Sequence, residues 1–131
     1  PREGITYTPF TTLDGVFEKI KIGAHDYKAP KRLTTLHQNK DYGQWGVDGK
    51  VPACFLSSIH TTGGNSGSPV LNARGELVGL NFDRVWEGTM SDIMFDPAKC
   101  RNIVVDIRYV LFLIDKYAKA GYLLEEMELV K

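Results

Sequence analysis

The seven residues Gly63-Gly64-Asn65-Ser66-Gly67-Ser68-Pro69 constrain the fold of this chain more than any other segment. Three glycines in seven positions favour a tight turn with backbone conformations that other residues rarely adopt. Segments typical of β-strands lie on both sides, over 51–59 and 68–72, and another follows over 76–82. We therefore expect the turn to join strands of one sheet. The last two segments, separated by Ala73-Arg74-Gly75, are predicted to form a hairpin.

Helical patterns flank this β-rich middle. Residues 13–21 place apolar side chains on one face directly after Thr12, a residue type that caps helices well. A second short helix is predicted over 31–40. The most regular pattern covers 109–120 and is expected to be capped by Gly121.

These patterns indicate one domain over residues 1–131 of mixed α+β class, mainly β in its middle. Residues 1–50 are expected to be a lead-in of helices and loops. The strands and the glycine-rich turn occupy 51–107, where the last strand is predicted over 103–107. Residues 108–131 complete the chain as a helix and tail.

The composition excludes several classes of protein. Lysine plus arginine and aspartate plus glutamate both number 16, and this zero net charge argues against general nucleic-acid binding. No apolar run is long enough to span a membrane. Cys54 and Cys100 could form one disulfide or stay as two buried thiols, and neither has the spacing of a metal site, so we predict no metal and no cofactor. The opening residues Pro1-Arg2-Glu3-Gly4 contain no hydrophobic leader, so we expect a mature form or an internal fragment.

Ser66 is the candidate nucleophile. A serine hydroxyl attacks a carbonyl only when a base removes its proton, and the resulting oxyanion needs hydrogen-bond donors. A left-handed conformation at Gly64 would point the amides of Gly64 and Ser66 into one concavity. The alternative interpretation is an ordinary glycine-rich hairpin turn without catalytic function.

The turn and the hairpin after it resemble the nucleophile-bearing hairpin of chymotrypsin-like peptidases. That resemblance implies a His-Asp-Ser triad. None of His25, His37 and His60 is expected to be the base, and His60 is expected to line the specificity pocket or the strand leading to it. We therefore expect this chain to be the second half of a catalytic domain, whose base and orienting aspartate lie upstream of residue 1.

Two peptidase families share the motif. Bacterial glutamyl endopeptidases resemble the chain only around the Ser66 turn, and Asn81 stands where they carry a substrate-binding histidine. The whole chain is similar to bacterial dipeptidyl-peptidases that have a chymotrypsin-like double barrel and an inserted helical domain. The blocks that carry this resemblance are Tyr7-Thr8-Pro9-Phe10-Thr11-Thr12, Gly64-Asn65-Ser66-Gly67-Ser68-Pro69-Val70, Gly79-Leu80-Asn81-Phe82-Asp83, Trp86-Glu87 and Val105-Asp106-Ile107-Arg108-Tyr109-Val110-Leu111-Phe112.

The resemblance assigns substrate-binding roles to two adjacent residues. Asp83 matches the aspartate that helps to hold the α-ammonium of the substrate, and Arg84 matches the arginine of the branch that prefers Asp or Glu before the scissile bond. A guanidinium suits this task because its planar fork pairs with a carboxylate through two hydrogen bonds. The plainer alternatives are a turn residue for Asp83 and a solvated surface arginine for Arg84. Because adjacent side chains of a strand point to opposite faces, a turn or bulge must bring both into one cleft.

The sequence therefore predicts a serine peptidase fragment whose parent releases N-terminal dipeptides with Asp or Glu in second position. Its expected partners are a peptide substrate and the upstream barrel of the same protein, and a homodimeric parent is left open. The resemblance also implies a periplasmic or cell-surface location. Without its base, the isolated chain is expected to be inactive. The remaining alternatives are a glutamyl endopeptidase fragment and a non-catalytic binding domain with a peptidase fold.

Overall fold

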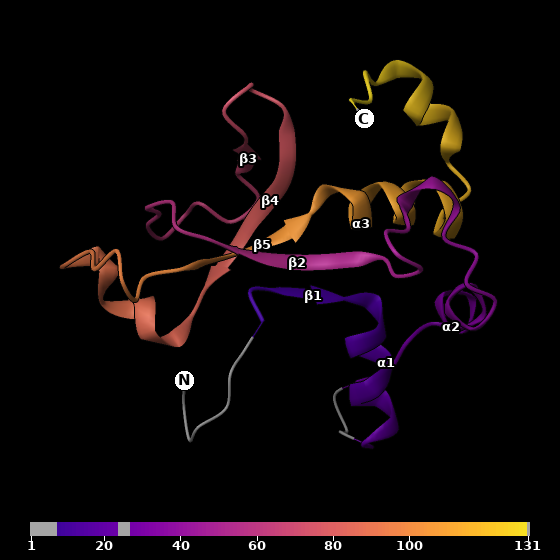
Figure 1. The fold of residues 1–131 in the computed structure, drawn as a ribbon, viewed down its shortest axis with the longest axis horizontal. Helices are drawn as coiled ribbons and strands as arrows, with labels where there is room; N and C mark the ends of the chain where they lie inside the picture. The colour runs from indigo at the N-terminus through magenta and orange to yellow at the C-terminus, as the bar shows by residue number, and fades with distance from the viewer. Residues whose placement is uncertain (1–7, 24–26, 131) are drawn as a thin grey trace.

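The computed structural model describes residues 8–23 and 27–130, which form one antiparallel sheet and several helices (Figure 1). The five strands lie in the order β1-β2-β5-β4-β3, and each neighbouring pair is antiparallel. They are β1 Phe10–Thr12, β2 Pro52–Ser57, β3 Pro69–Leu71, β4 Leu77–Arg84 and β5 Asn102–Asp106. The predicted mixed class with a β-rich middle is confirmed.

All three α-helices gather at the end of the sheet where β1 and β5 end and β2 begins, on the right of Figure 1, whereas the 3-10 helix after β4 lies at the other end. The α-helices are α1 Leu13–Lys21, α2 Lys31–Gln38 and α3 Ile107–Phe112, and the π-helical turn η3 Leu113–Tyr117 extends α3. The 3-10 helices are η1 Gly43–Trp45, η2 Trp86–Asp92 and η4 Gly121–Glu126. The predicted helices over 13–21 and 31–40 are therefore both present, the second ending two residues early.

The sheet is open within the described residues, with β1 and β3 as its edges. A barrel requires hydrogen bonds between the two edge strands, and each edge strand here has only three residues. The strands of the described residues therefore do not close a barrel by themselves.

The main hydrophobic core lies between the helices and the adjoining end of the sheet. Leu13 and Phe17 project from α1 into it, and Phe112 of α3 is fully buried there. The other buried members of this core are Leu33, Tyr42, Trp45, Val51 and Leu111. The one-sided pattern of 13–21 is thus explained by burial in this core, where Phe17 also stacks on His37 of α2, because helices in proteins are stabilised mainly through their apolar face.

The start of α1 differs from the prediction in one detail. Thr12 is the N-cap residue, but its side chain makes no capping hydrogen bond. Instead, the backbone N–H of Leu13 donates to the carbonyl of Val51 at 2.9 Å. The sheet supplies the acceptor because β1 continues directly into α1, so the predicted role of the Thr12 hydroxyl is wrong.

The C-terminal helix also ends differently from the prediction. It begins at Ile107, where the Asp106 side chain accepts from the Arg108 amide at 2.9 Å and so caps the helix. The π-helical turn inserts an extra residue, and Lys119 takes the left-handed conformation, with φ of 56°, that was expected of Gly121. Gly121 opens the next 3-10 helix instead of capping this one.

The middle of the sheet depends on close packing at Gly79 in β4. A Cβ atom at this position would lie 2.5 Å from both Val104 Cγ1 and the Val105 carbonyl oxygen of β5. Only glycine fits where two backbones approach this closely. Gly79 thereby allows β4 and β5 to pair directly behind the glycine-rich turn.

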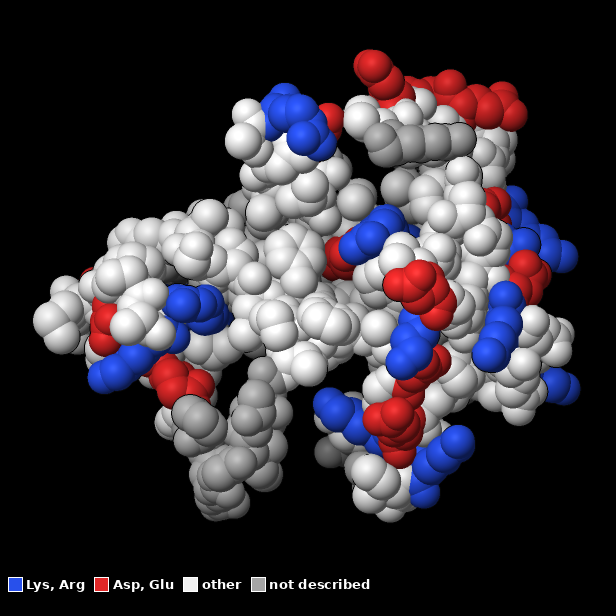
Figure 2. Space-filling view, viewed as in Figure 1, with Lys and Arg blue, Asp and Glu red and all other residues white. Residues whose placement is uncertain are grey.

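Charged side chains are distributed unevenly over the surface. Figure 2 shows mixed charges over the helices, few charges over the middle of the sheet, and an acidic cluster on the C-terminal segment. Glu125, Glu126 and Glu128 are exposed there. Among the described residues, no helix has the length and apolar character that crossing a membrane requires.

The two cysteines are free thiols. Cys54 lies in β2 and is partly buried, whereas Cys100 is buried just before β5. Burial raises the pKa of the Cys54 thiol, which makes it a poor nucleophile at neutral pH.

Candidate active site

The turn that carries Ser66 connects β2 to β3 and is organised by its own polar groups. The Asn65 side chain accepts from the Thr62 amide at 2.8 Å, and the Ser68 amide donates to the Asn65 carbonyl at 3.0 Å. Gly64 and Gly67 have φ angles of 94° and 86°, which other residues reach only with strain. The left-handed conformation predicted for Gly64 is therefore present.

Asn81 of β4 fastens this turn to the sheet. Its backbone N–H donates to the Ser68 carbonyl at 2.9 Å, and its carbonyl accepts from the Gly67 amide at 2.7 Å. Its side-chain Nδ2 also donates to the Asn65 carbonyl at 3.2 Å. Asn81 thus contacts the turn on both sides of Ser66, at Asn65 before it and at Gly67 and Ser68 after it.

The side-chain oxygen of Asn81 is unusual. Among the described residues, its Oδ1 is the one buried side-chain polar atom that lacks a hydrogen-bond partner. Leaving such an acceptor unsatisfied costs about 1–3 kcal/mol. Rotating the amide would place this oxygen against the Asn65 carbonyl, so the bond from Nδ2 fixes the orientation that is observed.

Ser66 itself is exposed, and its hydroxyl donates to the Phe82 carbonyl at 3.3 Å. Among the described residues, neither the Gly64 amide nor the Ser66 amide donates to an acceptor. Both amides are therefore available to an incoming oxygen atom, as an oxyanion site requires.

A hollow of about 130 Å³ lies beside Ser66, between the turn and the end of β4. Its lining residues are Thr61, Thr62, Gly63, Gly64, Ser66, Asn81, Phe82, Asp83 and Arg84. All four residues singled out by the sequence, namely Gly64, Ser66, Asp83 and Arg84, border this one hollow.

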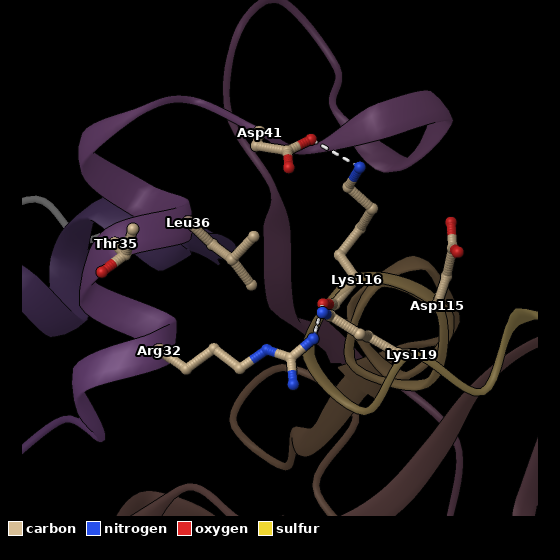
Figure 3. Close-up of a pocket in the computed structure, with 7 residues that line it drawn as sticks. All are labelled: Arg32, Thr35, Leu36, Asp41, Asp115, Lys116 and Lys119. Carbon is tan, nitrogen blue, oxygen red and sulfur yellow. Dashed lines mark hydrogen bonds and ion pairs between the residues drawn. The ribbon is translucent and has the colours of Figure 1, made fainter.

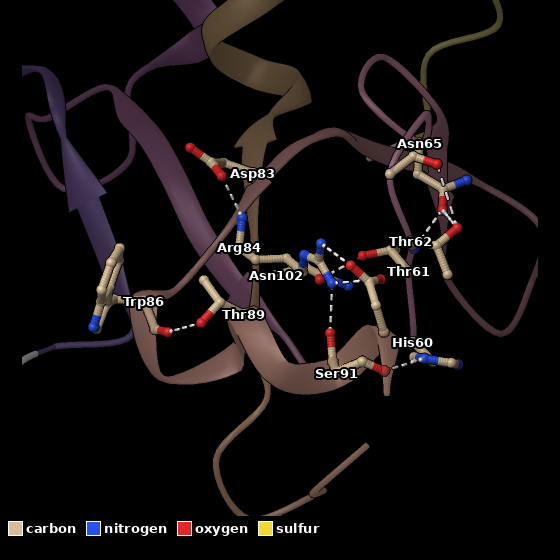
Figure 4. A network of polar contacts seen from close by, with 12 residues as sticks. His60, Thr61, Thr62, Asn65, Asp83, Arg84, Trp86, Thr89, Ser91 and Asn102 are labelled. Carbon is tan, nitrogen blue, oxygen red and sulfur yellow. Dashed lines mark hydrogen bonds and ion pairs between the residues drawn. The ribbon is translucent and has the colours of Figure 1, made fainter. Parts of the chain in front are cut away.

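A β-bulge brings Asp83 and Arg84 to the same hollow. The pairing of β4 with β5 shifts between Asn81 and Asp83, so that Phe82 is an extra residue in β4. Such a bulge re-aims the side chains that follow it, as a cleft shared by Asp83 and Arg84 requires. In Figure 4 the Asp83 carboxylate and the Arg84 guanidinium still leave the strand in different directions. Asp83 is exposed, and its Oδ1 accepts from the Arg84 amide at 2.7 Å.

The Arg84 guanidinium is already occupied, which the sequence did not predict. It binds the Asp92 carboxylate through two hydrogen bonds of 2.9 Å each, and Nη1 also donates to Ser91 Oγ at 2.6 Å. The hydrogen-bonded guanidinium holds the pKa of Asp92 below its usual range, and Asp92 in turn raises the pKa of Arg84. No sequence signal marked Asp92, because residues 83–100 have no strand or helix period.

A polar network continues behind Arg84 (Figure 4). His60 Nε2 lies 3.3 Å from the Ser91 carbonyl and must donate to it, because a carbonyl only accepts. Thr61 Oγ1 donates to the buried Asn102 side chain at 2.7 Å, and Asn102 Nδ2 donates to the Ile59 carbonyl. His60 therefore braces η2 and does not border the hollow.

The other histidines supply no base for Ser66 within the described residues. His37 lies on α2, where its Nε2 bonds Asp14 Oδ1 at 2.9 Å and its ring stacks on Phe17. In Figure 1, α2 and the loop between β2 and β3 lie at opposite ends of the molecule. His25 lies outside the described residues.

A second, larger hollow of about 400 Å³ lies between α2 and η3 (Figure 3). Three of its lining residues are bonded to one another: Arg32 donates to the Lys116 carbonyl at 3.1 Å, and the Lys116 ammonium pairs with Asp41. The lining residues are Arg32, Thr35, Leu36, Asp41, Asp115, Lys116 and Lys119. In the described part of the chain, no group of three or more His, Cys, Asp or Glu side chains could hold a metal ion.

Comparisons with known proteins agree on one family. The family model described as Peptidase S46 matches residues 1–129. The Asp/Glu-specific dipeptidyl-peptidases of Capnocytophaga gingivalis and Flavobacterium psychrophilum are 61% and 58% identical over 100% and 99% of this chain. A protein of Porphyromonas endodontalis named dipeptidyl-peptidase 7 is 49% identical over 100% of it.

Solved structures give the same result. The crystal structure of Porphyromonas endodontalis DPP11 in complex with the dipeptide Arg-Asp matches 98% of this chain with a TM-score of 0.91 and 48% identity. The chain spans only 19% of that structure, and 18% of each of the two Asp/Glu-specific relatives. The similarity is therefore complete for this chain and covers less than a fifth of those proteins.

Proposed function

Because this chain belongs to the peptidase S46 family, we propose that it is the nucleophile-bearing part of a dipeptidyl-peptidase that releases dipeptides with Asp or Glu in second position. The observation that carries the proposal is the single hollow bordered by Gly64, Ser66, Asp83 and Arg84. The sequence predicts a catalytic or substrate-binding role for each of these four residues.

In this proposal Ser66 attacks the carbonyl carbon of the second residue of the peptide. The unoccupied amides of Gly64 and Ser66 stabilise the oxyanion that forms. The contacts of Asn81 hold the turn in place during the attack. The base that takes the proton from Ser66 and the aspartate that orients this base lie outside the chain.

Asp83 and Arg84 provide the specificity. The Asp83 carboxylate binds the α-ammonium of the substrate, so that only a free N-terminus two residues from the cleaved bond fits. The Arg84 guanidinium binds the acidic side chain of the second residue. Relatives named dipeptidyl-peptidase 7 are also 42–49% identical to this chain, so Arg84 supports the acidic branch more directly than overall similarity does.

The rest of the protein completes the site. We propose that the open sheet forms the second half of a chymotrypsin-like double barrel, in the C-terminal part of the catalytic domain, and that the upstream half supplies the base. A periplasmic or cell-surface location and a homodimeric parent remain predictions from the resemblance.

The proposal is tested by peptide cleavage with the complete protein. We expect release of the N-terminal dipeptide when Asp or Glu is second, and no cleavage when the N-terminus is acetylated. Replacing Ser66 by alanine should lower kcat at least about a thousandfold and abolish labelling by a fluorophosphonate. Cleavage of the N-terminally acetylated peptide at an internal Glu would favour the glutamyl endopeptidase alternative. If the fluorophosphonate does not label Ser66 in the wild-type protein, a non-catalytic domain is favoured.

The role of Arg84 is tested separately. Arg84→Gly should shift the preference from Asp and Glu towards apolar residues, because it removes the cation that pairs with the acidic side chain. Arg74→Gly is the matched control, since Arg74 lies in the β3–β4 turn and pairs with Glu76. An unchanged acidic preference in Arg84→Gly would remove this assignment.

A further inference from the structure

Arg84 binds Asp92 in the same geometry in which a guanidinium binds the carboxylate of a ligand. Arg84 Nη1 and Nη2 donate to Asp92 Oδ1 and Oδ2, each at 2.9 Å. Two parallel bonds from a guanidinium to a carboxylate are also the arrangement that recognises the side chain of Asp or Glu in a ligand. Asp92 therefore occupies the part of Arg84 that an acidic substrate would use.

We propose that Asp92 is an internal competitor, which binds the Arg84 fork in the empty site and is displaced by the acidic side chain of the peptide. This inference rests on the proposed function, and it adds a residue that sets how strongly acidic substrates bind.

Asp92 competes with a substrate carboxylate for Arg84 whether the substrate approaches the two Nη atoms or the Nε edge. A substrate carboxylate that takes the two Nη atoms must displace Asp92 from them. A carboxylate that approaches the Nε edge instead meets a cation whose charge Asp92 already offsets, together with a second negative charge nearby. In both cases the Asp92 charge opposes the binding of an acidic side chain.

The Asp92 carboxylate can leave this contact at low cost, whereas other contacts hold the Arg84 guanidinium in place. The Asp92 side chain is 47% exposed, so water can solvate its carboxylate once it leaves the guanidinium. Asp92 is the last residue of η2, and the next residue, Ile93, is 95% exposed. Because the Asp92 carboxylate is solvated once the pair separates, breaking the contact costs less than it would for a buried carboxylate.

The Arg84 side chain is held by contacts that do not involve Asp92. It is only 22% exposed, and Nη1 also donates to the hydroxyl of Ser91, a residue that is 5% exposed. The Ser91 carbonyl is in turn bound by His60. When Asp92 leaves, the guanidinium therefore keeps a fixed hydrogen bond and stays oriented for the substrate.

The internal carboxylate also limits selectivity. With Asp92 in place, the charge of Arg84 at the edge of the hollow is already paired, so an apolar side chain does not leave an unpaired cation beside it. With the Asp92 charge removed, acidic side chains should gain affinity and apolar ones should gain none. Asp92 thus reduces the preference that Arg84 creates.

The test is Asp92→Asn in the complete protein. Asparagine has the same shape and keeps one oxygen as an acceptor for Arg84, so orientation is largely retained while the charge is lost. We expect KM for a dipeptide substrate with Asp in second position to fall about three- to tenfold, the scale of charge effects at partly exposed sites. KM for the matching substrate with Leu should not fall.

Binding without catalysis gives an independent measurement. In the Ser66→Ala background, calorimetric titration with the dipeptide Arg-Asp should show a dissociation constant lowered by the same factor in Asp92→Asn. The control is Asp96→Asn, the same chemical change four residues later. Asp96 accepts from the Ala98 amide at 2.9 Å and pairs with Lys99 at 3.7 Å, without contact to Arg84, so no change is expected.

The outcomes separate this inference from the proposed function. If the wild-type protein releases no acidic dipeptide, the proposed function fails whatever the variants do. If it does release them, an unchanged or raised KM in Asp92→Asn overturns the competitor role and leaves Asp92 as a structural partner of Arg84. Asp92→Ala serves as the second variant, and failure of both to fold would also overturn the inference, because a displaceable ligand is not needed for folding.

Discussion

The helical end of the molecule and the Ser66 end of the sheet are held together by different forces. The helical end contains the main cluster of buried apolar side chains, with Phe112 and Leu13 fully enclosed. The Ser66 end is held chiefly by polar contacts. Of the four buried polar residues in the described part of the chain, Asn81, Ser91 and Asn102 lie there, and Asp106 caps α3. Apolar burial stabilises without fixing direction, whereas hydrogen bonds fix positions. The helical end thus contributes most of the stability, whereas the Ser66 end sets the geometry of the site.

The largest expected effect is a loss of stability at the helical end. Phe112→Ala removes a fully buried ring that meets Tyr42 edge-on, with ring centroids 6.0 Å apart. We expect the free energy of unfolding of the complete protein to fall by about 3–5 kcal/mol, measured by urea denaturation. The folded fraction should keep nearly normal kcat, because Phe112 does not border the hollow.

The control for Phe112 is Phe10→Ala on the edge strand β1, where the side chain is 58% exposed. Its effect on stability should be much smaller. Equal losses in the two variants would show that the helical core is not the main source of stability.

A smaller effect is expected at the Ser66 end. Asn81→Ala keeps the backbone contacts of the turn but removes the bond from Nδ2 to the Asn65 carbonyl. We expect kcat to fall about ten- to a hundredfold, with little change in KM, because the turn loses precision and not binding surface.

Stability should change by about 1 kcal/mol or less in this variant, since the same substitution removes the unsatisfied Oδ1. Asn39→Ala, at the exposed end of α2, is the control and should leave kcat unchanged. A large loss of stability with normal kcat in Asn81→Ala would make Asn81 a structural residue only.

The smallest expected effects on stability come from the same substitution, glycine to alanine, made once in each region. Gly15 of α1 and Gly75 of the β3–β4 turn both have open space around the position of a Cβ atom, but only Gly75 has a positive φ, of 80°. Gly15→Ala should raise the free energy of unfolding by about 0.5–1 kcal/mol, because alanine favours a helix.

Gly75→Ala should lower the free energy of unfolding by about 1 kcal/mol, because alanine is strained in the left-handed region. Thermal unfolding of both variants measures the two shifts. The same sign for both would contradict the assignment of these backbone conformations.

Much of the local structure could be predicted from the sequence. The helix over 13–21, the hairpin and the left-handed Gly64 follow from patterns that span a few residues. Two local predictions were wrong, at Thr12 and Gly121. In the first, a carbonyl from another strand satisfied the helix end, and in the second a π-helical turn shifted the helix end by an inserted residue. Neither event leaves a local sequence signature.

The residues that the sequence named for the site lie around one hollow, but their contacts were not predicted. Ser66, Gly64, Asp83 and Arg84 were named from chemistry and resemblance, and they border one hollow. Their roles remain proposals. The partner of Arg84 was missed, because Asp92 lies in a segment without periodicity and reaches Arg84 only after η2 has folded back onto β4.

The sequence by itself determined the turn around Ser66 and the helices, because glycine conformations and apolar periodicity act over a few neighbouring residues. Only the tertiary structure decided that Asn81 fastens the turn, that a bulge at Phe82 brings Asp83 and Arg84 to the hollow, and that Asp92 occupies the guanidinium. These contacts join residues that are separated along the chain or depend on strand register. Polar groups can pair only after apolar burial and strand pairing have brought their backbones together.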